Sequence, residues 1–339
     1  MRIVIVGGGV VGTTLWRILS RQGIEATVLD RAPAGATGAP RPFMLPYHGF
    51  DALRAAGVWE PIHAIAWEIA PQADGPVAIT ATFTHVSALL ADGVPVHHDS
   101  EVTGLVREQG GRITGVTVRD GSGDHALDAD LVVACDGLGS PTRTLAGLTA
   151  ETRSSGAGHL SFLTPVIIDR PFTMHYQSTG RQVGLLGWPQ GSGGWGGIRR
   201  RREGAARPPG LDRLRGALAP LLAAPRPALD WLTSVDQLVY REPLILTCPR
   251  WWTPGLVIIG DAAHFLGPEA GIGAGLGLGD AHALAQAIAQ NRTDPDAACA
   301  DYERWRAPAA RPYEAVGPEG ARIVRGGIQP TGEIWPPEE

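Results

Sequence analysis

The chain begins with a short β-branched run at residues 3–6, followed at once by three glycines, Gly7, Gly9 and Gly12. Such a run predicts a buried strand, and residues 13–20 continue as a helix. The glycine spacing suits a tight turn out of the strand, close approach of a pyrophosphate to the backbone, and close packing of the helix on the strand. The helix start offers free N–H groups to phosphates. This opening predicts the first half of a dinucleotide-binding unit.

The second half of such a unit follows in its expected place. A strand predicted over residues 26–29 ends at Asp30, near the roughly 20-residue distance at which such units carry the carboxylate for the ribose hydroxyls. The neighbouring residues Val10, Val11 and Arg31 are included in the predicted site. The alternative interpretation is a helix–sheet turn that binds no ligand, because glycine-rich loops are common.

Length and composition narrow the classes of protein. A chain of 339 residues predicts about two domains, and its net charge of −5 predicts no bulk attraction to nucleic acid or to an anionic membrane. All basic residues are arginine, so no lysine Schiff base is available. We expect no signal peptide and no membrane span. The cysteines lack metal-ligand spacing, which predicts no metal site and favours a reducing cytoplasm: Cys135, Cys248 and Cys299.

Residues 32–42 form a loop rich in Pro, Gly and Ala that no regular element would tolerate. Arg41 is its main charge, and it is either a solvated loop arginine or a phosphate contact at a cofactor. Beyond the loop we expect a short helix over 50–58, helical turns over 85–90, and strands over 67–69, 77–83, 94–97, 101–106, 112–119 and 125–127.

A second motif, Asp136-Gly137, follows a buried-strand pattern at residues 131–135. Ligands gather at the carboxyl ends of strands in open α/β sheets, so this position favours a binding role. An ordinary strand-end turn is the alternative.

Residues 156–247 have a different character, rich in Gly, Trp, Arg and Pro. We expect an antiparallel sheet and one helix, which fits a substrate domain inserted into the first domain. The Arg199–Arg202 run is either a solvated guard of an edge strand or a contact for an anionic substrate or nicotinamide nucleotide. The expected elements are strands over 159–168, 174–177, 182–188, 195–199 and 235–246, and a helix over 211–224.

A third motif, Gly260-Asp261-Ala-Ala-His264, ends a strand predicted over residues 256–259. A glycine-rich loop and helix start follow, and the helix continues to residue 289. Glycines before a helix again favour an anion or dipole site. A last helix over 297–316 precedes a Pro- and Glu-rich tail.

Together and in this order, the three motifs resemble the FAD-dependent monooxygenases of the para-hydroxybenzoate hydroxylase type, the class A flavoprotein hydroxylases. Residues 302–306, Tyr-Glu-Arg-Trp-Arg, are similar to the C-terminal Y-E-x-x-R helix of that family. The resemblance implies an α/β fold in which a discontinuous, Rossmann-like FAD-binding domain of the GR2 type carries an inserted antiparallel-sheet α+β substrate domain. The implied boundaries are 1–70, 86–155 and 248–316 for the FAD-binding domain with its C-terminal helix, 71–85 and 156–247 for the substrate domain, and 317–339 for the tail.

The resemblance also implies a role for each motif. The first glycine loop would hold the FAD pyrophosphate, and Asp30 the adenosine ribose. Asp136 and Gly137 match a motif linked to both FAD and NAD(P)H. Gly260 and Asp261 lie where the family contacts the ribityl chain, with the carboxylate of Asp261 making the bond. The residues implied beside the isoalloxazine are Pro268, Gly271, Ile272, Gly273 and Ala274.

The activity implied by the resemblance is hydroxylation or epoxidation of a small aromatic or polyketide-like substrate with NAD(P)H and O₂, through a flavin C4a-hydroperoxide. The protein would supply orientation and a dry pocket rather than a nucleophile. A flavoprotein oxidoreductase or cyclase that inserts no oxygen, and a nucleotide-binding sensor, are the alternatives. We assign no catalytic side chain, because ordinary packing is the favoured interpretation of the pocket candidates His48, His175, Tyr176, Trp188 and Trp195.

Three departures from the family pattern stand out, the first being that a chain of 339 residues is short for the family. Phe83, Thr84 and His85 occupy the area where the family places an arginine before the first substrate-side helix. Ile272 and Gly275 replace the usual Gln and Asn of the glycine run.

Overall fold

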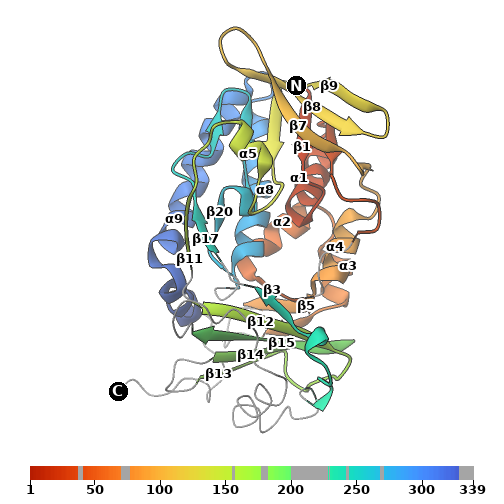
Figure 1. The fold of residues 1–339 in the computed structure, drawn as a ribbon, viewed down its shortest axis with the longest axis vertical. Helices are drawn as coiled ribbons and strands as arrows, with labels where there is room; N and C mark the ends of the chain where they lie inside the picture. Colours follow the sequence, from red (N-terminus) through yellow and green to blue (C-terminus); the bar gives the residue numbers. More distant parts are fainter. Residues whose placement is uncertain are drawn as a thin grey trace.

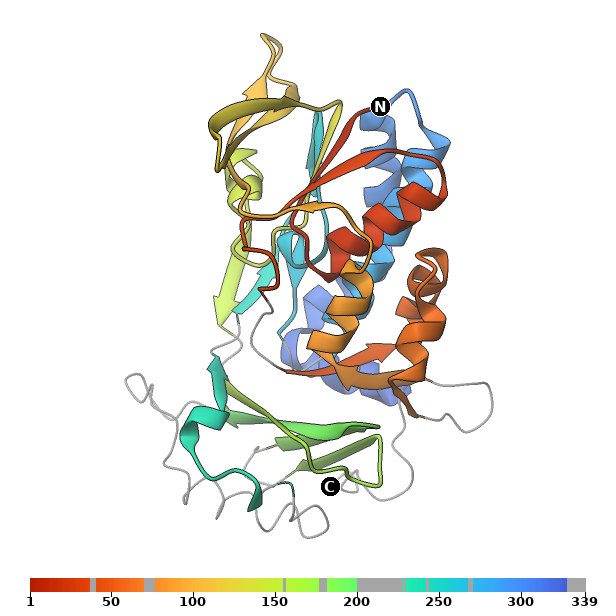
Figure 2. The ribbon, with the colours of Figure 1, turned by 90° about the vertical axis from the view of Figure 1, so that its right-hand side faces the viewer.

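The computed structural model describes residues 1–36, 41–69, 77–154, 157–176, 182–199, 228, 230–241, 244–267 and 271–327. A parallel sheet with its helices forms one part of the molecule, and an antiparallel sheet lies at the other end (Figures 1 and 2). The mixed α/β fold that we expected is therefore confirmed.

The central sheet has six strands in the order β18-β19-β10-β1-β2-β6. All neighbouring pairs are parallel except β18 with β19. The middle strands form because their β-branched residues are buried on both faces, as parallel sheets require. The strands are β18 (Trp252–Thr253), β19 (Leu256–Ile258), β10 (Leu131–Ala134), β1 (Ile3–Val6), β2 (Ala26–Leu29) and β6 (Val96–His97).

The register brings the ends of three strands to one edge. Val6 pairs with Ala134, and Ala134 pairs with Ile258. The residues that follow these strands must therefore lie side by side, as expected at the carboxyl edge of a parallel sheet.

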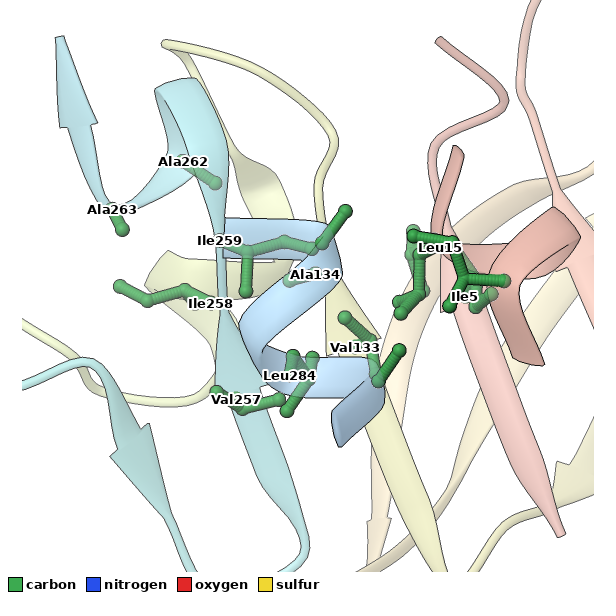
Figure 3. Packing of buried hydrophobic residues seen from close by; sticks show 14 of the residues in the cluster. Ile5, Leu15, Val133, Ala134, Val257, Ile258, Ile259, Ala262, Ala263 and Leu284 are labelled. Atoms are coloured by element: carbon green, nitrogen blue, oxygen red, sulfur yellow. The ribbon is translucent and has the colours of Figure 1, made fainter. Parts of the chain in front are cut away.

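Three helices lie against this sheet: α1 (Val10–Arg21), α8 (Gly273–Gln290) and α9 (Pro295–Gly327). Figure 3 shows Leu284 of α8 among Val133 and Val257 of the sheet, with Leu15 of α1 beside Ile5. Both Leu284 and Leu15 are fully buried. The apolar faces of α1 and α8 thus form the core that fixes the strand ends.

Four shorter helices and three small sheets complete this part of the molecule. The helices are α2 (Phe50–Ala55), α3 (Trp59–Ala64), α4 (Phe83–Ala91) and α5 (Pro141–Leu145). The sheets are β3-β5-β4, β7-β8-β9 and β11-β17-β20. Their strands are β3 (Pro42–Pro46), β4 (Trp67–Ile69), β5 (Ala78–Thr82), β7 (Glu101–Arg107), β8 (Ile113–Asp120), β9 (Gly123–Asp128), β11 (Glu151–Ser154), β17 (Leu244–Thr247) and β20 (His264–Phe265).

The antiparallel sheet at the other end has the order β13-β14-β15-β12-β16. It meets the first part through β5, because the Thr80 hydroxyl donates to the Gly187 carbonyl at 2.5 Å. The division of the chain into two domains at the boundaries given above stays a proposal. The strands are β12 (Ala157–Thr164), β13 (Phe172–Tyr176), β14 (Gln182–Trp188), β15 (Gly191–Arg199) and β16 (Val239–Arg241).

Several predicted elements differ from the observed ones. The loop expected over 32–42 gives way to β3 at Pro42, because β3 pairs with β5 in an antiparallel ladder. Phe83 begins α4 rather than ending a strand, since the Thr82 hydroxyl caps the helix by accepting the His85 N–H. The segment expected as one strand over 235–246 contains a 3₁₀ turn, β16 and the start of β17.

The last two helices are longer than predicted. The glycine run expected as a loop and helix start is helical from Gly273, and α9 continues beyond residue 316 to Gly327. The helix predicted over 211–224 and residues 200–202 of the arginine run lie outside the described residues.

Candidate cofactor site

The first glycine loop is shaped by close contacts at two of its three glycines. Gly7 has φ +115°, and a Cβ atom there would lie 2.5 Å from the Cys135 carbonyl oxygen. A Cβ on Gly12 would collide with the carbonyl oxygen of Gly7. Gly9 precedes α1 as its N-cap, and a Cβ there would meet no atom within 4 Å. The first and third glycines are thus required by packing. The second faces open space, and the free N–H groups at the start of α1 are available to a ligand there.

Asp30 ties the end of β2 to this loop. Its carboxylate accepts the Gly8 N–H at 2.7 Å and the Ala32 N–H at 2.8 Å. The side chain is half-buried, so it is held rigidly and still reaches solvent. Arg31, next in the chain, is exposed.

The second motif follows β10 and begins α5. The Asp136 carboxylate accepts hydrogen bonds from the Ser140 hydroxyl and the Thr142 N–H, so it organises the start of that helix. Gly137 has φ +87° and faces open space. Arg143, which is 7% exposed, donates to the Ala262 carbonyl at 2.8 Å. This bond ties the second motif to the third.

The third motif turns sharply at Gly260, which has φ +60°. Asp261 follows in a short 3₁₀ turn, and within the described residues its carboxylate accepts no hydrogen bond. Burial, aided by the nearby Asp280 charge, raises the pKa of Asp261 above its ordinary value, although His264 and Arg41 oppose the shift. A half-buried carboxylate without an internal donor fits a role in binding a hydroxylated ligand.

The start of α8 lies against this turn. Ile272 is the N-cap and is buried with Ile245, Leu266 and Leu276. The next two residues, Gly273 and Ala274, remain half-exposed. Gly271 has φ +63°, which sets the direction of the chain into the helix. Pro268 lies outside the described residues.

Arg41 brings a positive charge toward the same edge. Its guanidinium carbon lies 3.4 Å from the centre of the Phe83 ring, and the Arg41 carbonyl accepts the Phe83 N–H at 3.1 Å. Phe83 stands where the family places an arginine, and its ring packs against the guanidinium of Arg41, which precedes β3.

The pocket candidates divide into two groups. Trp188 is buried at 2% exposure, and Trp195 stacks on Phe172 with ring centres 6.1 Å apart, so both take part in packing. The side chains of His48, His175 and Tyr176 lie outside the described residues.

Three residues of this region were not assigned from the sequence: Arg143, Asp280 and Arg306. Asp280 is the one acidic residue in α8, which contains no Arg or Lys, and an acid in such a helix is a signal for a buried ionic partner. Among the described residues no group of His, Cys, Asp and Glu could hold a metal ion. No helix in the described ranges is long and apolar enough to cross a membrane.

Fold and site together define a dinucleotide-binding flavoprotein, with three strand-end motifs at one sheet edge. The chain belongs to the FAD binding domain family, whose pattern matches residues 1–73, 85–193 and 246–315.

Characterised relatives share most of its length. The chain is 26% identical over 348 residues to the 3-hydroxybenzoate 6-hydroxylase of Klebsiella oxytoca, covering 91% of this chain and 85% of that protein. It is 26% identical over 346 residues to the aurachin C monooxygenase/isomerase of Stigmatella aurantiaca, covering 93% and 87%. The predicted resemblance is confirmed, and the chain is a flavin-dependent monooxygenase.

Solved structures share the fold. PqsL of Pseudomonas aeruginosa, described as a probable FAD-dependent monooxygenase, superposes with a TM-score of 0.79 at 20% identity over 97% of this chain and 100% of that one. HpxO of Klebsiella pneumoniae, solved with FAD and uric acid, gives a TM-score of 0.78 at 20% identity over 96% and 89%.

Proposed function

We propose that this enzyme uses NAD(P)H and O₂ to hydroxylate or epoxidise a small aromatic or polyketide-like substrate. The observation that carries the proposal is the meeting of Gly7, Asp136 and Gly260 at one edge of the parallel sheet, through the register of β1, β10 and β19. A long dinucleotide needs contacts at both of its ends, and the first and third motifs are our candidates for them.

The residues present fit FAD. The open space at Gly9 and the start of α1 would receive the pyrophosphate, and Asp30 the adenosine ribose. Asp261, which has no donor among the described residues, would accept from the ribityl hydroxyls. The flavin, when bound, supplies hydride acceptance and the activation of O₂.

The start of α8 has a separate task. Its Ile272 side chain is 1% exposed and packs with Ile245, Leu266 and Leu276, so it anchors the start of the helix. The half-exposed backbone of Gly273 and Ala274 presents the positive end of the α8 dipole. With FAD bound, that end would favour negative charge on the reduced ring.

The substrate class is supported by the relatives and by the second sheet. One relative is a hydroxylase of 3-hydroxybenzoate by name, and PqsL has been solved with 2-aminobenzoylacetate. We assign substrate binding to residues 71–85 and 156–247. Direct strand pairing places Ser161 and Trp195 on one face of the sheet, with Leu163 and Gly193. Because Pro42 packs on Gly193, that face is turned toward β3 and the cofactor-binding part.

The co-substrate and the cellular setting belong to the same proposal. Asp136, Gly137 and the Arg199–Arg202 run are the candidates for recognising NAD(P)H. All three cysteines are free, which fits a cytoplasmic enzyme. Tailoring of a secondary metabolite is the role that we favour.

The test begins with the absorption spectrum of the purified protein. We expect the yellow colour of bound flavin, consumption of NADH or NADPH with a suitable phenol or quinolone, and one ¹⁸O atom from ¹⁸O₂ in the product. A colourless protein that FAD cannot reconstitute would overturn the proposal. Turnover that continues unchanged without oxygen would establish the non-oxygenating alternative instead.

A further inference from the structure

Asp280 is a fully buried carboxylate in the middle of α8, at 0% exposure. One carboxylate oxygen accepts a hydrogen bond from the Gly260 N–H at 2.9 Å. The same oxygen is hydrogen-bonded to His264 Nε2 at 2.7 Å. The other oxygen accepts from Arg306 Nε at 2.9 Å. A single side chain therefore joins the third motif to helix α9.

The surrounding structure is built to admit this arrangement. Arg306 also donates to the Leu276 carbonyl at 3.1 Å, so its guanidinium lies along α8. A Cβ on Gly279 would lie 2.9 Å from Arg306 Nη2, so glycine makes room for that guanidinium. Glycine inside a helix costs about 0.5–1 kcal/mol, whereas a larger side chain here would push the guanidinium away and leave a buried carboxylate without its cation.

Asp261 in this turn and Asp280, which reaches the turn from α8, have pKa shifts of opposite direction. Burial alone would raise the pKa of Asp280, but His264, Arg306 and the Gly260 N–H together lower it. The pKa of Asp261 is raised by burial. Asp280 thus accepts hydrogen bonds from Gly260, His264 and Arg306, whereas Asp261 accepts none among the described residues.

We propose that Asp280 is a positioning residue for the cofactor: it fixes the turn through the Gly260 N–H and holds the His264 ring away from Asp261, which leaves that carboxylate available to the ribityl hydroxyls. Without Asp280, the His264 ring would become a donor for Asp261, because His264 is already close enough to influence the pKa of that carboxyl. Arg306 fixes Asp280 from α9. This inference rests on the proposed function, since it takes FAD as the ligand of Asp261.

The test is a double-mutant cycle on FAD affinity. The dissociation constant of FAD is measured by fluorescence titration of the apoprotein for wild type, Asp261→Asn, Asp280→Asn and the double variant. We expect each single substitution to raise the constant by about tenfold or more, because Asp261→Asn removes the charged acceptor and Asp280→Asn frees the His264 ring to occupy it. We expect the double variant to lie within about twofold of the weaker single variant, since both changes act on one contact.

A purely structural role for Asp280 would lower the melting temperature and give additive effects on affinity, and that result would overturn the inference. If Asp280→Asn does not fold, the cycle is run with Arg306→Lys, which keeps the charge but loses the fixed geometry of the guanidinium. Arg304→Lys on the same helix is the matched control, because its side chain is 69% exposed. Failure of the wild type to bind FAD would refute the proposed function itself, whereas additivity in a flavin-binding protein refutes only the role of Asp280.

Discussion

Val11 in the first turn of α1 packs against Gly277 of α8: a Cβ atom on Gly277 would lie 2.7 Å from Val11 Cγ2. The same valine meets Gly260, where an added Cβ would lie 3.1 Å from Cγ2. The Val11 side chain therefore sets how closely the start of α1 approaches both the Gly260 turn and helix α8. The two ends of the proposed cofactor site are joined by direct packing.

This contact predicts that Gly277→Ala destabilises the protein by about 1–3 kcal/mol through overpacking, despite the better helix propensity of alanine. Thermal unfolding of the apoprotein measures the effect. The matched control is Val11→Ala combined with Gly277→Ala, which restores the space and should recover most of the lost stability. A single variant as stable as wild type would contradict the contact.

Asp261→Asn should stabilise the apoprotein at neutral pH while weakening FAD retention. The folded-state pKa of Asp261 is raised by burial, so its ionisation opposes folding above the unfolded value near 3.8. The gain is about 1.4 kcal/mol for each unit of pKa displacement, and it should vanish below the unfolded pKa, where both states are protonated. Melting temperatures between pH 3 and 8 measure it. A stability difference that does not change with pH would count against the buried carboxylate.

Phe83→Leu should weaken FAD binding by about two- to fivefold, because it removes an aromatic face worth about 0.5–1 kcal/mol beneath the Arg41 guanidinium. Phe83→Tyr keeps that face and serves as the control. Flavin titration of both variants gives the comparison. Equal losses in the two variants would show that ring stacking does not position Arg41.

Arg17→Met should lower the free energy of unfolding by about 1.5–3 kcal/mol, as expected for lost bonds to a charged donor. Arg17 of α1 donates to the carbonyls of Leu89 at 3.1 Å and Leu90 at 2.7 Å, and to that of Asp92, so it caps the end of α4. Urea unfolding with an unchanged m-value would measure it. Arg304→Met, in an exposed ion pair, should cost under about 1 kcal/mol. Similar losses for both variants would exclude the capping role.

The strands of the parallel sheet could be predicted because their signal is local. Ile3–Val6 and Ala26–Leu29 have the predicted bounds, because the glycine or aspartate that follows each apolar run marks the end of the strand. The glycine run was expected to be a loop and helix start, because glycine propensity marks no helix boundary there, and the structure is helical from Gly273. Helix α8 packs closely in this region because Gly277 and Gly279 leave room for the side chains of Val11 and Arg306. Those two residues are distant in the chain, so a local pattern does not indicate the contacts.

In the candidate site, too, local sequence signals could be predicted and contacts between distant residues could not. Its glycines and acids could be placed from their spacing, and the structure brings the three motifs to one edge. The roles of individual residues toward the cofactor stay predictions. Asp280 was missed because its three partners come from three other elements, and no local pattern pairs Gly260, His264 and Arg306 with it.

The order of the central sheet has a consequence for how the protein is made. The ribosome releases β1 first, but β1 pairs with β10 at residues 131–134, and β10 pairs with β19 at residues 256–258. The nascent chain therefore carries an open sheet edge through most of synthesis, and Arg306 emerges later still. Such late, long-range pairing folds slowly and exposes apolar surface to aggregation. We expect recombinant yield to rise with chaperones and slower expression.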